Sequence, residues 1–439
     1  MTSPAVTTPH HRLAALGVAG MMLAMALALI PTLVSPTSAD AQSNVVTIRT
    51  TDNAQRVVRS NPAGTTFRFA PGVHRNVKIL PKNGQTFTAD SVGSAVLDGG
   101  GSTDVAFRTR TNRRSDRFSY NVTIENLVFT GYAPIKFWGV IDASSDDYQR
   151  HGPEWKRPTN WTMRNLRFEN NPGSDDSTAI GVGSGSTVAN VDIRNHPGVG
   201  VFGHGTDIVI RNSTITDTSS NADIFWHSGG IKLIVAHDAR IIDNTISNSR
   251  GHGVWIDINS DNVLIARNEI RNNDLAGIFY EVSRRGKIFR NTVVDNGAGD
   301  TRGWMFEAGI VLSTSHNSLV WRNSLENNAG GVTVIDQRTL RREDRRLAPL
   351  FGELFEATNG NRAPWRGAYN SIRNNTILGG GVHGASAAGA ESVNSTVYNT
   401  TVFRGNTYSG GPLSFRWGSG DSYADGLSFS QWKQIHPND

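Results

Sequence analysis

The stretch IIDNTISNSRGHGVWIDINSDNVLIARNEIRNNDLAGIFYEVSRRGKIFRNTV, residues 241–293, contains one short pattern three times. The pattern is an apolar residue, one or two variable residues, an asparagine, and then further apolar residues in alternation. Its copies in this stretch are IIDNTI (241–246), IARNEI (265–270) and IFRNTV (288–293). A pattern that recurs at this spacing indicates a protein built from structural repeats.

The same pattern extends well beyond this stretch in both directions. Further copies are IENLVF (124–129), MRNLRF (163–168), VANVDI (188–193), IRNSTI (210–215), VWRNSL (320–325), IRNNTI (372–377) and a degenerate VFRGNTY (402–408). The motif asparagines Asn190, Asn212, Asn244, Asn268, Asn291 and Asn323 are 22, 32, 24, 23 and 32 residues apart. We therefore infer coils of about 22–24 residues with occasional insertions.

Each repeat contains short stretches of alternating apolar and polar residues, separated by Asn, Gly, Asp and Ser. Such stretches are typical of strands. We predict an all-β protein with a single right-handed parallel β-helix, a solenoid with capped ends and asparagine ladders at its turns. A leucine-rich repeat would need a leucine pattern that this sequence lacks, and propeller repeats are longer.

The chain divides into four expected segments. We expect a signal peptide at residues 1–41, an N-terminal cap with the first coils at 42–119, the parallel β-helix at 120–410, and a C-terminal cap segment at 411–439. A long insertion at 338–368 interrupts the repeats. The caps cover the apolar face and the unpaired strand edges that the end coils of a solenoid expose.

The signal-peptide prediction places the mature protein outside the cell. His10, His11 and Arg12 precede an apolar run over residues 13–34, and Ala39-Asp40-Ala41 matches a cleavage site. A membrane anchor is the alternative. We expect a secreted protein with no membrane attachment after cleavage. The chain has 0 cysteines, so its fold forms without disulfides.

Charge gives limited information about partners. The net charge is +5, which is compatible with an acidic glycan. Apart from residues 338–346 there is no Lys/Arg-rich block, so we expect no nucleic-acid partner. The oligomeric state is left open.

Glycines mark the start of one strand on successive coils. Counting back from each motif asparagine reaches Gly198, Gly230, Gly253, Gly277 and Gly309. Alternation along these strands sorts the two faces. The inward set is Ile231, Leu233, Val254, Ile256, Ile258, Ile278, Tyr280, Ile310 and Leu312. The outward set is Lys232, Trp255, Asp257, Phe279 and Glu281.

The outward set predicts a site. Asp257 and Glu281 hold the same position on adjacent coils, which lie about 4.8 Å apart. Insertions at 216–229 and 296–308 would form two walls of a groove over them. The expected substrate-binding residues are Lys232, Trp255, Phe279, Trp226, His227, Trp304 and Glu307, with His252 in a turn at the rim. Aromatic faces beside carboxylates suit a sugar ring, so we expect a carbohydrate polymer or oligosaccharide as partner.

Two carboxyl groups about 5–5.5 Å apart match a retaining glycosidase. The stretch 253–291, with GVWIDI followed by GIFYEV, resembles the β-helix glycoside hydrolases that include β-xylosidases, within the pectate-lyase-like superfamily of carbohydrate-active enzymes. This resemblance covers a small part of the chain. It implies that Asp257 is the nucleophile and Glu281 the acid/base of a secreted glycoside hydrolase.

Three alternatives remain. A polysaccharide lyase or uronate epimerase would use Lys232 as base, Asp257 and Glu281 as calcium-binding or neutralising groups, and Arg284 or Arg285 as helpers. A non-catalytic solenoid would only bind glycan. The Gly-His-Gly triplet at 251–253 is similar to that of polygalacturonases, but Asp175-Asp176 lie two coils earlier and Gly-Ile-Lys (230–232) lacks the arginine of that family.

No cofactor is expected from the sequence. His204, His237 and His316 show no metal-ligand spacing, and the chain has no phosphate-binding glycine loop or nucleophile-elbow serine. Calcium enters only with the lyase alternative.

Overall fold

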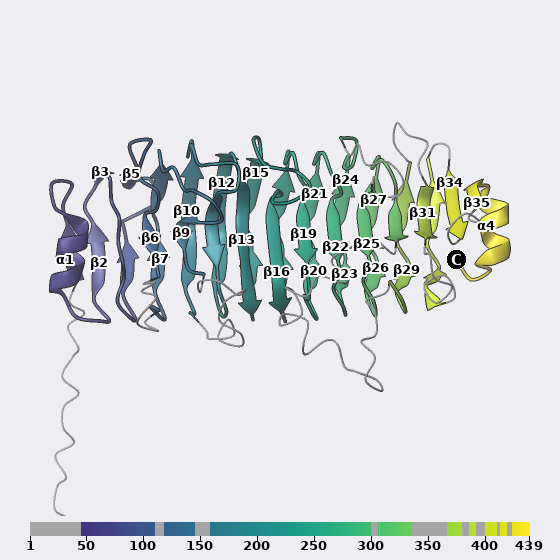
Figure 1. Ribbon diagram of the computed structural model, residues 1–439, viewed down its shortest axis with the longest axis horizontal. Helices are drawn as coiled ribbons and strands as arrows, with labels where there is room; N and C mark the ends of the chain where they lie inside the picture. Colours follow the sequence, from purple (N-terminus) through teal and green to yellow (C-terminus); the bar gives the residue numbers. More distant parts are fainter. Residues whose placement is uncertain are drawn as a thin grey trace, which may run out of the picture. The chain divides into compact units, whose positions relative to one another are not determined.

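The computed structural model describes residues 45–109, 118–144, 159–299, 306, 308–335, 367–379, 386–391, 400–410, 413–418 and 424–439. The expected signal peptide at 1–41 and residues 338–366 of the expected insertion lie outside this part of the chain. Within it, each strand pairs in parallel with the equivalent strand one coil further on, and strands β34 and β35 form an antiparallel pair at the last coil. The protein is a parallel β-helix, as predicted (Figure 1).

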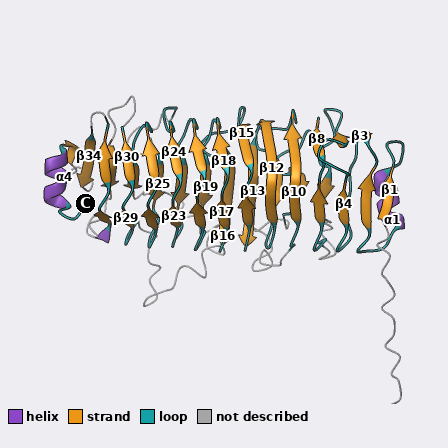
Figure 2. Cartoon of the chain, turned by 180° about the vertical axis from the view of Figure 1, so that it is seen from behind, coloured by secondary structure: helices purple, strands orange, loops and turns teal. Residues whose placement is uncertain are grey.

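The strands stack into three faces (Figures 1 and 2). The first face holds β1 (Val45–Ile48), β2 (Thr66–Phe69), β4 (Thr86–Thr88), β7 (Thr123–Glu125), β10 (Thr162–Glu169), β12 (Thr187–His196), β14 (Val209–Arg211), β17 (Arg240–Ile242), β20 (Leu264–Ala266), β23 (Lys287–Phe289), β26 (Leu319–Trp321), β29 (Ser371–Arg373) and β32 (Val402–Arg404). The second face holds β3 (Gly72–Arg75), β5 (Ala95–Asp98), β8 (Val128–Thr130), β15 (Thr214–Thr218), β18 (Thr245–Ser247), β21 (Glu269–Arg271), β24 (Thr292–Val294), β27 (Ser324–Glu326), β30 (Thr376–Leu378) and β33 (Thr407–Ser409).

The third face holds β6 (Phe107–Arg108), β9 (Gly139–Asp142), β11 (Thr178–Val182), β13 (Val199–Thr206), β16 (Ile231–His237), β19 (Val254–Asp257), β22 (Ile278–Glu281), β25 (Ile310–Ser313), β28 (Val332–Ile335), β31 (Ser386–Glu391), β34 (Ser414–Gly418) and β35 (Ala424–Leu427). The first two faces join into one sheet because β10 and β12 are long enough to span both. The third face is a separate sheet, and it carries the predicted site residues Lys232, Trp255, Asp257, Phe279 and Glu281.

The core lies between the three faces. On the third face, Ile231, Val254, Ile278, Ile310 and Val332 form one inward column, with each residue paired to the next and none exposed. Burying a Val or Ile side chain contributes about 1.5–3 kcal/mol. A column of such residues on each face therefore stabilises the solenoid without disulfides.

A ladder of asparagine side chains runs along the turn between the first two faces, as predicted. In the ladder, the amide nitrogen of each asparagine donates to the amide oxygen on the next coil at 2.9–3.0 Å. Its members are Asn244, Asn268, Asn291, Asn323, Asn375 and Asn406. The oxygen also accepts the preceding backbone N–H, as in Asn244 to Asn268 at 3.0 Å. These bonds satisfy polar groups that are buried at the turn.

Of the six motif asparagines whose spacing defines the coil length, Asn190 and Asn212 are not members of this ladder. Asn212 aligns with Asp243, and Ser213 aligns with Asn244, because Arg211 pairs with Ile242. Asn190 and Asn212 instead occupy the neighbouring turn position, with φ of 54° and 51°. This left-handed conformation favours asparagine for a different reason, namely its tolerance of positive φ. The asparagine of the sequence motif therefore occupies one turn position in the ladder coils and the preceding turn position in the coils of Asn190 and Asn212.

The expected register also needs one correction. Gly230, Gly253, Gly277 and Gly309 precede paired residues and do align, but Gly198 does not. Val201 pairs with Ile231, so Gly200 is the residue that aligns with Gly230. One reason is a bulge: β16 has an extra residue between the pairs Gly203–Leu233 and Gly205–Ala236. The coils from β16 onward are therefore longer at this end of the third face.

A helix lies at each end of the described β-helix (Figure 1). Helix α1 (Ala54–Ser60) begins after Asn53, whose side chain accepts the Arg56 N–H, and it packs Val58 into the core. Helix α4 (Phe429–Ile435) begins with a capping box at Ser428 and buries Trp432. No helix in the described part of the chain is both long and apolar enough to span a membrane.

Candidate functional site

Lys232 lies at the centre of the outward side of the third face, on β16. Its ammonium nitrogen is 3.4 Å from Oδ2 of Asp257 and 3.1 Å from the centre of the Trp255 ring. It also donates a hydrogen bond of 2.5 Å to the carbonyl oxygen of Trp226. The strand register explains the contacts with Trp255 and Asp257, because Lys232 pairs with Trp255 on β19 and Ile234 pairs with Asp257. The expected proximity of Lys232, Trp255 and Asp257 is confirmed.

Glu281 joins the same network from β22. Its Oε2 accepts a hydrogen bond of 3.1 Å from the indole nitrogen of Trp255. Trp255 pairs with Phe279 across β19 and β22, so Asp257 and Glu281 hold equivalent positions on adjacent strands. The other oxygen of Asp257, Oδ1, accepts the backbone N–H of Ile258 at 2.8 Å. Lys232, Trp255, Asp257 and Glu281 form a continuous polar network, which we call the Lys232 network.

The Lys232 network is buried, whereas an open groove was expected. Lys232, Asp257 and Glu281 keep 4%, 2% and 5% of their surface exposed. Trp255 and Phe279 are each 1% exposed and belong to a small apolar cluster outside the main core. Charged groups are costly to bury unless they are paired and hydrogen-bonded. The contacts of Lys232 with Asp257, and of Glu281 with Trp255, offset that cost in this closed site.

His252 is also buried, although a turn at the rim was expected. It is 0% exposed, and its ring stacks on Phe279 with centroids 4.5 Å apart and meets Trp255 edge-on at 4.9 Å. His252 is therefore a component of the aromatic cluster beneath the network. As positioned in this structure, Trp255, Phe279 and His252 support the charged groups and are shielded from a ligand in solution.

The loop before β16, residues 219–230, holds Trp226 and His227 near the network. The Trp226 side chain is 52% exposed, while His227 is buried against Phe137 and Phe202 with ring centroids 4.9 and 4.6 Å away. Burial, the charge of Lys232 and the nearby His196 lower the pKa of His227 to about 3. His227 is therefore neutral at ordinary pH, and Trp226 alone of the two is available to a ligand from outside.

A strained corner follows the two carboxylates. Ile258 and Val282 come directly after Asp257 and Glu281 and have φ of 35° and 42°. Positive φ in a β-branched residue is rare and costs about 1–2 kcal/mol. Val235 and Thr314 continue this column with φ of 47° and 49°. Ile258, expected in the core, lies instead in this corner outside the core cluster, because the chain turns there.

Arg284 and Arg285, which the lyase alternative assigned as helpers, are engaged elsewhere. Arg285 donates to both oxygens of Asp261 at 2.6 Å, and Arg284 lies 2.9 Å from the same carboxylate. Burial opposes ionisation of Asp261, but the two arginines outweigh it and lower its pKa. This clamp stabilises the turn after the third face.

Two predicted site residues, Trp304 and Glu307, lie outside the described residues. Within the described ranges, no group of three or more His, Cys, Asp or Glu side chains is arranged to hold a metal ion. The sequence did not predict that the Trp226 carbonyl oxygen accepts a hydrogen bond from Lys232, nor that the chain turns through a left-handed corner after Asp257 and Glu281. The bulge that creates the corner alters no residue pattern that would reveal it.

The β-helix has known relatives in fold. The family model described as "Right handed beta helix region" matches residues 154–314, which include the Lys232 network. The protein is a right-handed parallel β-helix. No curated protein matches the chain in sequence.

Two solved structures share this β-helix fold. The A-module of the mannuronan C-5 epimerase AlgE6 of Azotobacter vinelandii superposes with a TM-score of 0.53 at 14% identity, covering 83% of this chain and 92% of that one. A mannuronic acid specific polysaccharide family 6 lyase from human gut microbiota gives a TM-score of 0.50 at 13% identity, covering 89% and 90%. At these identities the likeness concerns the fold. The likeness to β-xylosidases stays a prediction.

Proposed function

We propose that this protein is an enzyme that acts on a polysaccharide and that the Lys232 network is its reaction centre. The observation that carries the proposal is the ammonium of Lys232, buried 3.4 Å from Asp257 beside Trp255 and Glu281. Replacing a buried ion pair by apolar residues is often neutral or stabilising, so stability alone gives little reason for such a network. Clusters of buried charged groups are typical of functional sites.

We further propose that the substrate contains uronate and that the reaction removes the proton next to its carboxylate. Lyases and epimerases of such polymers share this first step. The fold supports the proposal, since both proteins described above act on mannuronate polymers by their names. The step builds negative charge beside a carboxylate, and the Lys232 ammonium would offset that charge.

The contacts of Lys232 favour this role over that of the base. A carboxylate, an aromatic face and a carbonyl oxygen all stabilise the ammonium form. The same ammonium would repel a calcium ion from Asp257. We therefore assign charge neutralisation to Lys232 and the positioning of Lys232 to Asp257.

Glu281 is then the proposed base. Asp257 pairs directly with the Lys232 ammonium, whereas Glu281 lies one coil further on and contacts the network through the indole N–H of Trp255. In the step, Glu281 takes the proton and the C–H electron pair moves into the carboxylate of the sugar. A lyase then breaks the adjacent glycosidic C–O bond and forms a C=C double bond, and the leaving oxygen takes the proton held by Glu281 to become a sugar hydroxyl. In an epimerase, a water molecule on the opposite face gives a proton to the same carbon, and Glu281 releases its proton to solvent.

Hydrolysis is a second candidate because Asp257 and Glu281 hold equivalent positions on adjacent strands. Strand spacing is about 4.8 Å, close to the carboxyl separation of about 5–5.5 Å in retaining glycosidases. Asp257 would be the nucleophile and Glu281 the acid/base.

Product analysis separates these reactions. The full chain would be incubated with a panel of uronate and neutral polysaccharides, and products examined for unsaturated uronate, inverted uronate and new reducing ends. Unsaturated or inverted uronate, lost in Glu281→Gln and Lys232→Met, supports the proposal. Reducing ends without unsaturation would assign hydrolysis instead.

The control for these variants is Glu269→Gln, which makes the same change at an exposed carboxylate on β21 that pairs with Arg271. Glu269→Gln should keep full activity. Unchanged turnover in Glu281→Gln, or glycan binding without any turnover, would contradict the assignment of a reaction centre.

A further inference from the structure

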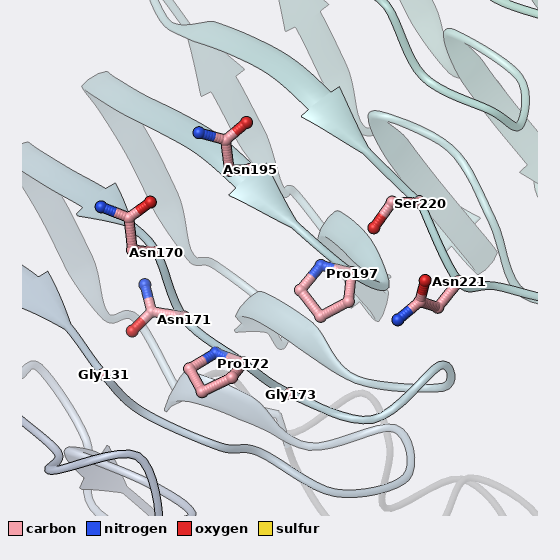
Figure 3. A pocket seen from close by; sticks show the side chains of 9 residues that line it. All are labelled: Gly131, Asn170, Asn171, Pro172, Gly173, Asn195, Pro197, Ser220 and Asn221. Carbon is pink, nitrogen blue, oxygen red and sulfur yellow. The ribbon is translucent and has the colours of Figure 1, made fainter.

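A cavity of about 500 Å³ opens at the corner that leads into the third face, on the N-terminal side of the Lys232 network. We propose that this cavity is a second carbohydrate-binding site, which takes an uncharged part of a saccharide. Its volume lies within the range of about 300–1,000 Å³ that small-molecule sites occupy. Its lining residues are Gly131, Asn170, Asn171, Pro172, Gly173, Asn195, Pro197, Ser220 and Asn221 (Figure 3).

The cavity exists because one coil is short between two longer ones. Only Pro197 and Gly198 connect β12 to β13, whereas residues 170–177 connect β10 to β11 and residues 219–230 connect β15 to β16. Buried Pro197 therefore forms the floor between two protruding loops. A side chain at Gly198 would come within 2.1 Å of the Ser177 carbonyl oxygen, so the short connection requires glycine.

Side-chain amides form one edge of the cavity. Asn170 and Asn195 follow the paired residues Glu169 and Arg194 on adjacent coils, and both are exposed. Their φ values of 53° and 52° hold them in the same left-handed turn. Figure 3 shows the two amides on one side, with Ser220 and Asn221 flanking Pro197 on the other. Each amide offers donors and an acceptor.

This chemistry suits sugar hydroxyls. A pair of neighbouring hydroxyls can donate to an amide oxygen and accept from an amide nitrogen, and the C–H face of a sugar ring can pack on Pro172 or Pro197. The nine lining residues include no charged side chain. A carboxylate or phosphate would therefore find no counter-charge among the lining side chains.

The cavity connects to the Lys232 network through one loop. Ser220 and Asn221 begin the loop 219–230, and Trp226 in the same loop accepts the hydrogen bond from Lys232. Phe225 and Trp226 are 39% and 52% exposed, so the loop also presents an aromatic surface. A glycan in the cavity would contact the loop that holds Lys232. The inference concerns binding and does not depend on which reaction the network performs.

The test is binding by titration calorimetry with the full chain carrying Glu281→Gln, which prevents turnover in either proposed reaction. The probes are xylotetraose, cellotetraose and mannotetraose, with tetramannuronate as the anionic comparison. We expect one neutral probe to bind and to bind at least tenfold more weakly in Asn170→Gly/Asn195→Gly. Glycine keeps the left-handed turns while it removes the amides. Ser220→Ala/Asn221→Ala should weaken binding in the same way from the opposite wall.

The matched control is Asn212→Gly, an exposed left-handed asparagine with φ of 51° that does not line the cavity. It should bind the neutral probe normally. The absence of binding by every neutral probe, or an affinity in both double variants equal to that of the parent Glu281→Gln chain, would overturn the proposal. If the glycine pair fails to fold, the alanine pair decides the result. Neutral binding together with no turnover by the unsubstituted chain would contradict only the proposed reaction.

Discussion

The ammonium nitrogen of Lys232 lies 3.4 Å from the carboxylate of Asp257, and only 5% and 3% of the two side-chain surfaces are exposed to solvent. A pair at this depth has lost most of its hydration, so each charge depends on the other. Trp255 strengthens the dependence, because its ring contacts Lys232 and its indole N–H binds Glu281. The network should therefore respond to substitution as one unit.

Replacing only one member of the Lys232–Asp257 pair should lower the free energy of unfolding more than replacing both. Lys232→Met leaves the Asp257 carboxylate buried without its ammonium partner, and we expect a loss of about 3–5 kcal/mol in the free energy of unfolding. Lys232→Met/Asp257→Asn should recover a substantial part of that loss while activity stays absent. Denaturant unfolding of the two single variants and the double variant measures the coupling. Additive losses would show that the two charges do not stabilise each other.

Trp255→Phe tests the indole bond to Glu281. The substitution removes the donor to a buried carboxylate, so unfolding should become easier by about 1–3 kcal/mol, and turnover should fall. The control is Trp321→Phe, at a half-buried tryptophan on the first face that stacks on Phe289. Thermal unfolding and product formation would be compared for both variants. Equal effects at the two sites would argue against a special role of the indole N–H.

The sequence predicts the fold well because a solenoid repeats its signal on every coil. Asn244, Asn268, Asn291 and Asn323 share one ladder, and their spacing alone gives the coil length. The outward placement of Lys232 and Asp257 follows from alternation. Local pattern thus determines which residues share a face.

Burial and corners are harder to predict from the sequence. Alternation assigns Trp255 to the outward side but contains no information about what packs against that side, and Trp255 is 1% exposed. Gly198 is two residues out of alignment because β16 has a one-residue bulge and because Asn212 aligns with Asp243, one position before Asn244. The left-handed corner displaced Ile258 from its expected core position. Each of these is a one-residue change in path, which leaves the apolar pattern intact.

In the left-handed corner, a glycine variant should be more stable than the alanine variant, which is the reverse of the usual order within a strand. At Ile258, with φ of 35°, Ile258→Gly should be more stable than Ile258→Ala by about 1 kcal/mol, because alanine keeps the steric penalty. At Ile256, within β19, alanine should be better by about 0.5–1 kcal/mol. Free energies of unfolding of the four variants decide this. The same order at both positions would mean that the corner is not strained.

Two buried histidines should make the protein less stable in acid. Burial lowers the pKa of His196 to about 3, and burial with the charge of Lys232 does the same for His227. Below the ordinary value of about 6.5 the unfolded chain binds protons that the folded protein does not. The free energy of unfolding should therefore fall as the pH drops from about 6.5 toward 3, by up to about 1.4 kcal/mol per unit for each histidine.

His227→Gln checks this dependence on pH. Urea unfolding at a series of pH values gives the slope, and the variant should lose the share that His227 contributes. The absolute stability of the variant is not the readout, since glutamine changes packing against Phe202 at every pH. A slope identical to that of the unchanged protein would show that His227 titrates normally when folded.

Asp439 ends the asparagine ladder, and its removal should destabilise the last coil. Its Oδ1 accepts the side-chain and backbone N–H groups of Asn406 at 2.7 and 3.0 Å, while Oδ2 accepts from Tyr408 at 2.6 Å and Trp432 at 2.8 Å. Asp439→Ala leaves these buried donors without an acceptor, so unfolding should become easier by at least about 2 kcal/mol. Asp439→Asn keeps one acceptor oxygen, so its free energy of unfolding should lie between those of the unchanged protein and Asp439→Ala. Asn438→Ala, at the exposed neighbour, should change stability by less than about 0.5 kcal/mol. Thermal unfolding of the three variants would contradict this account if Asp439→Ala matched Asn438→Ala, since the carboxylate would then add nothing that solvent does not supply.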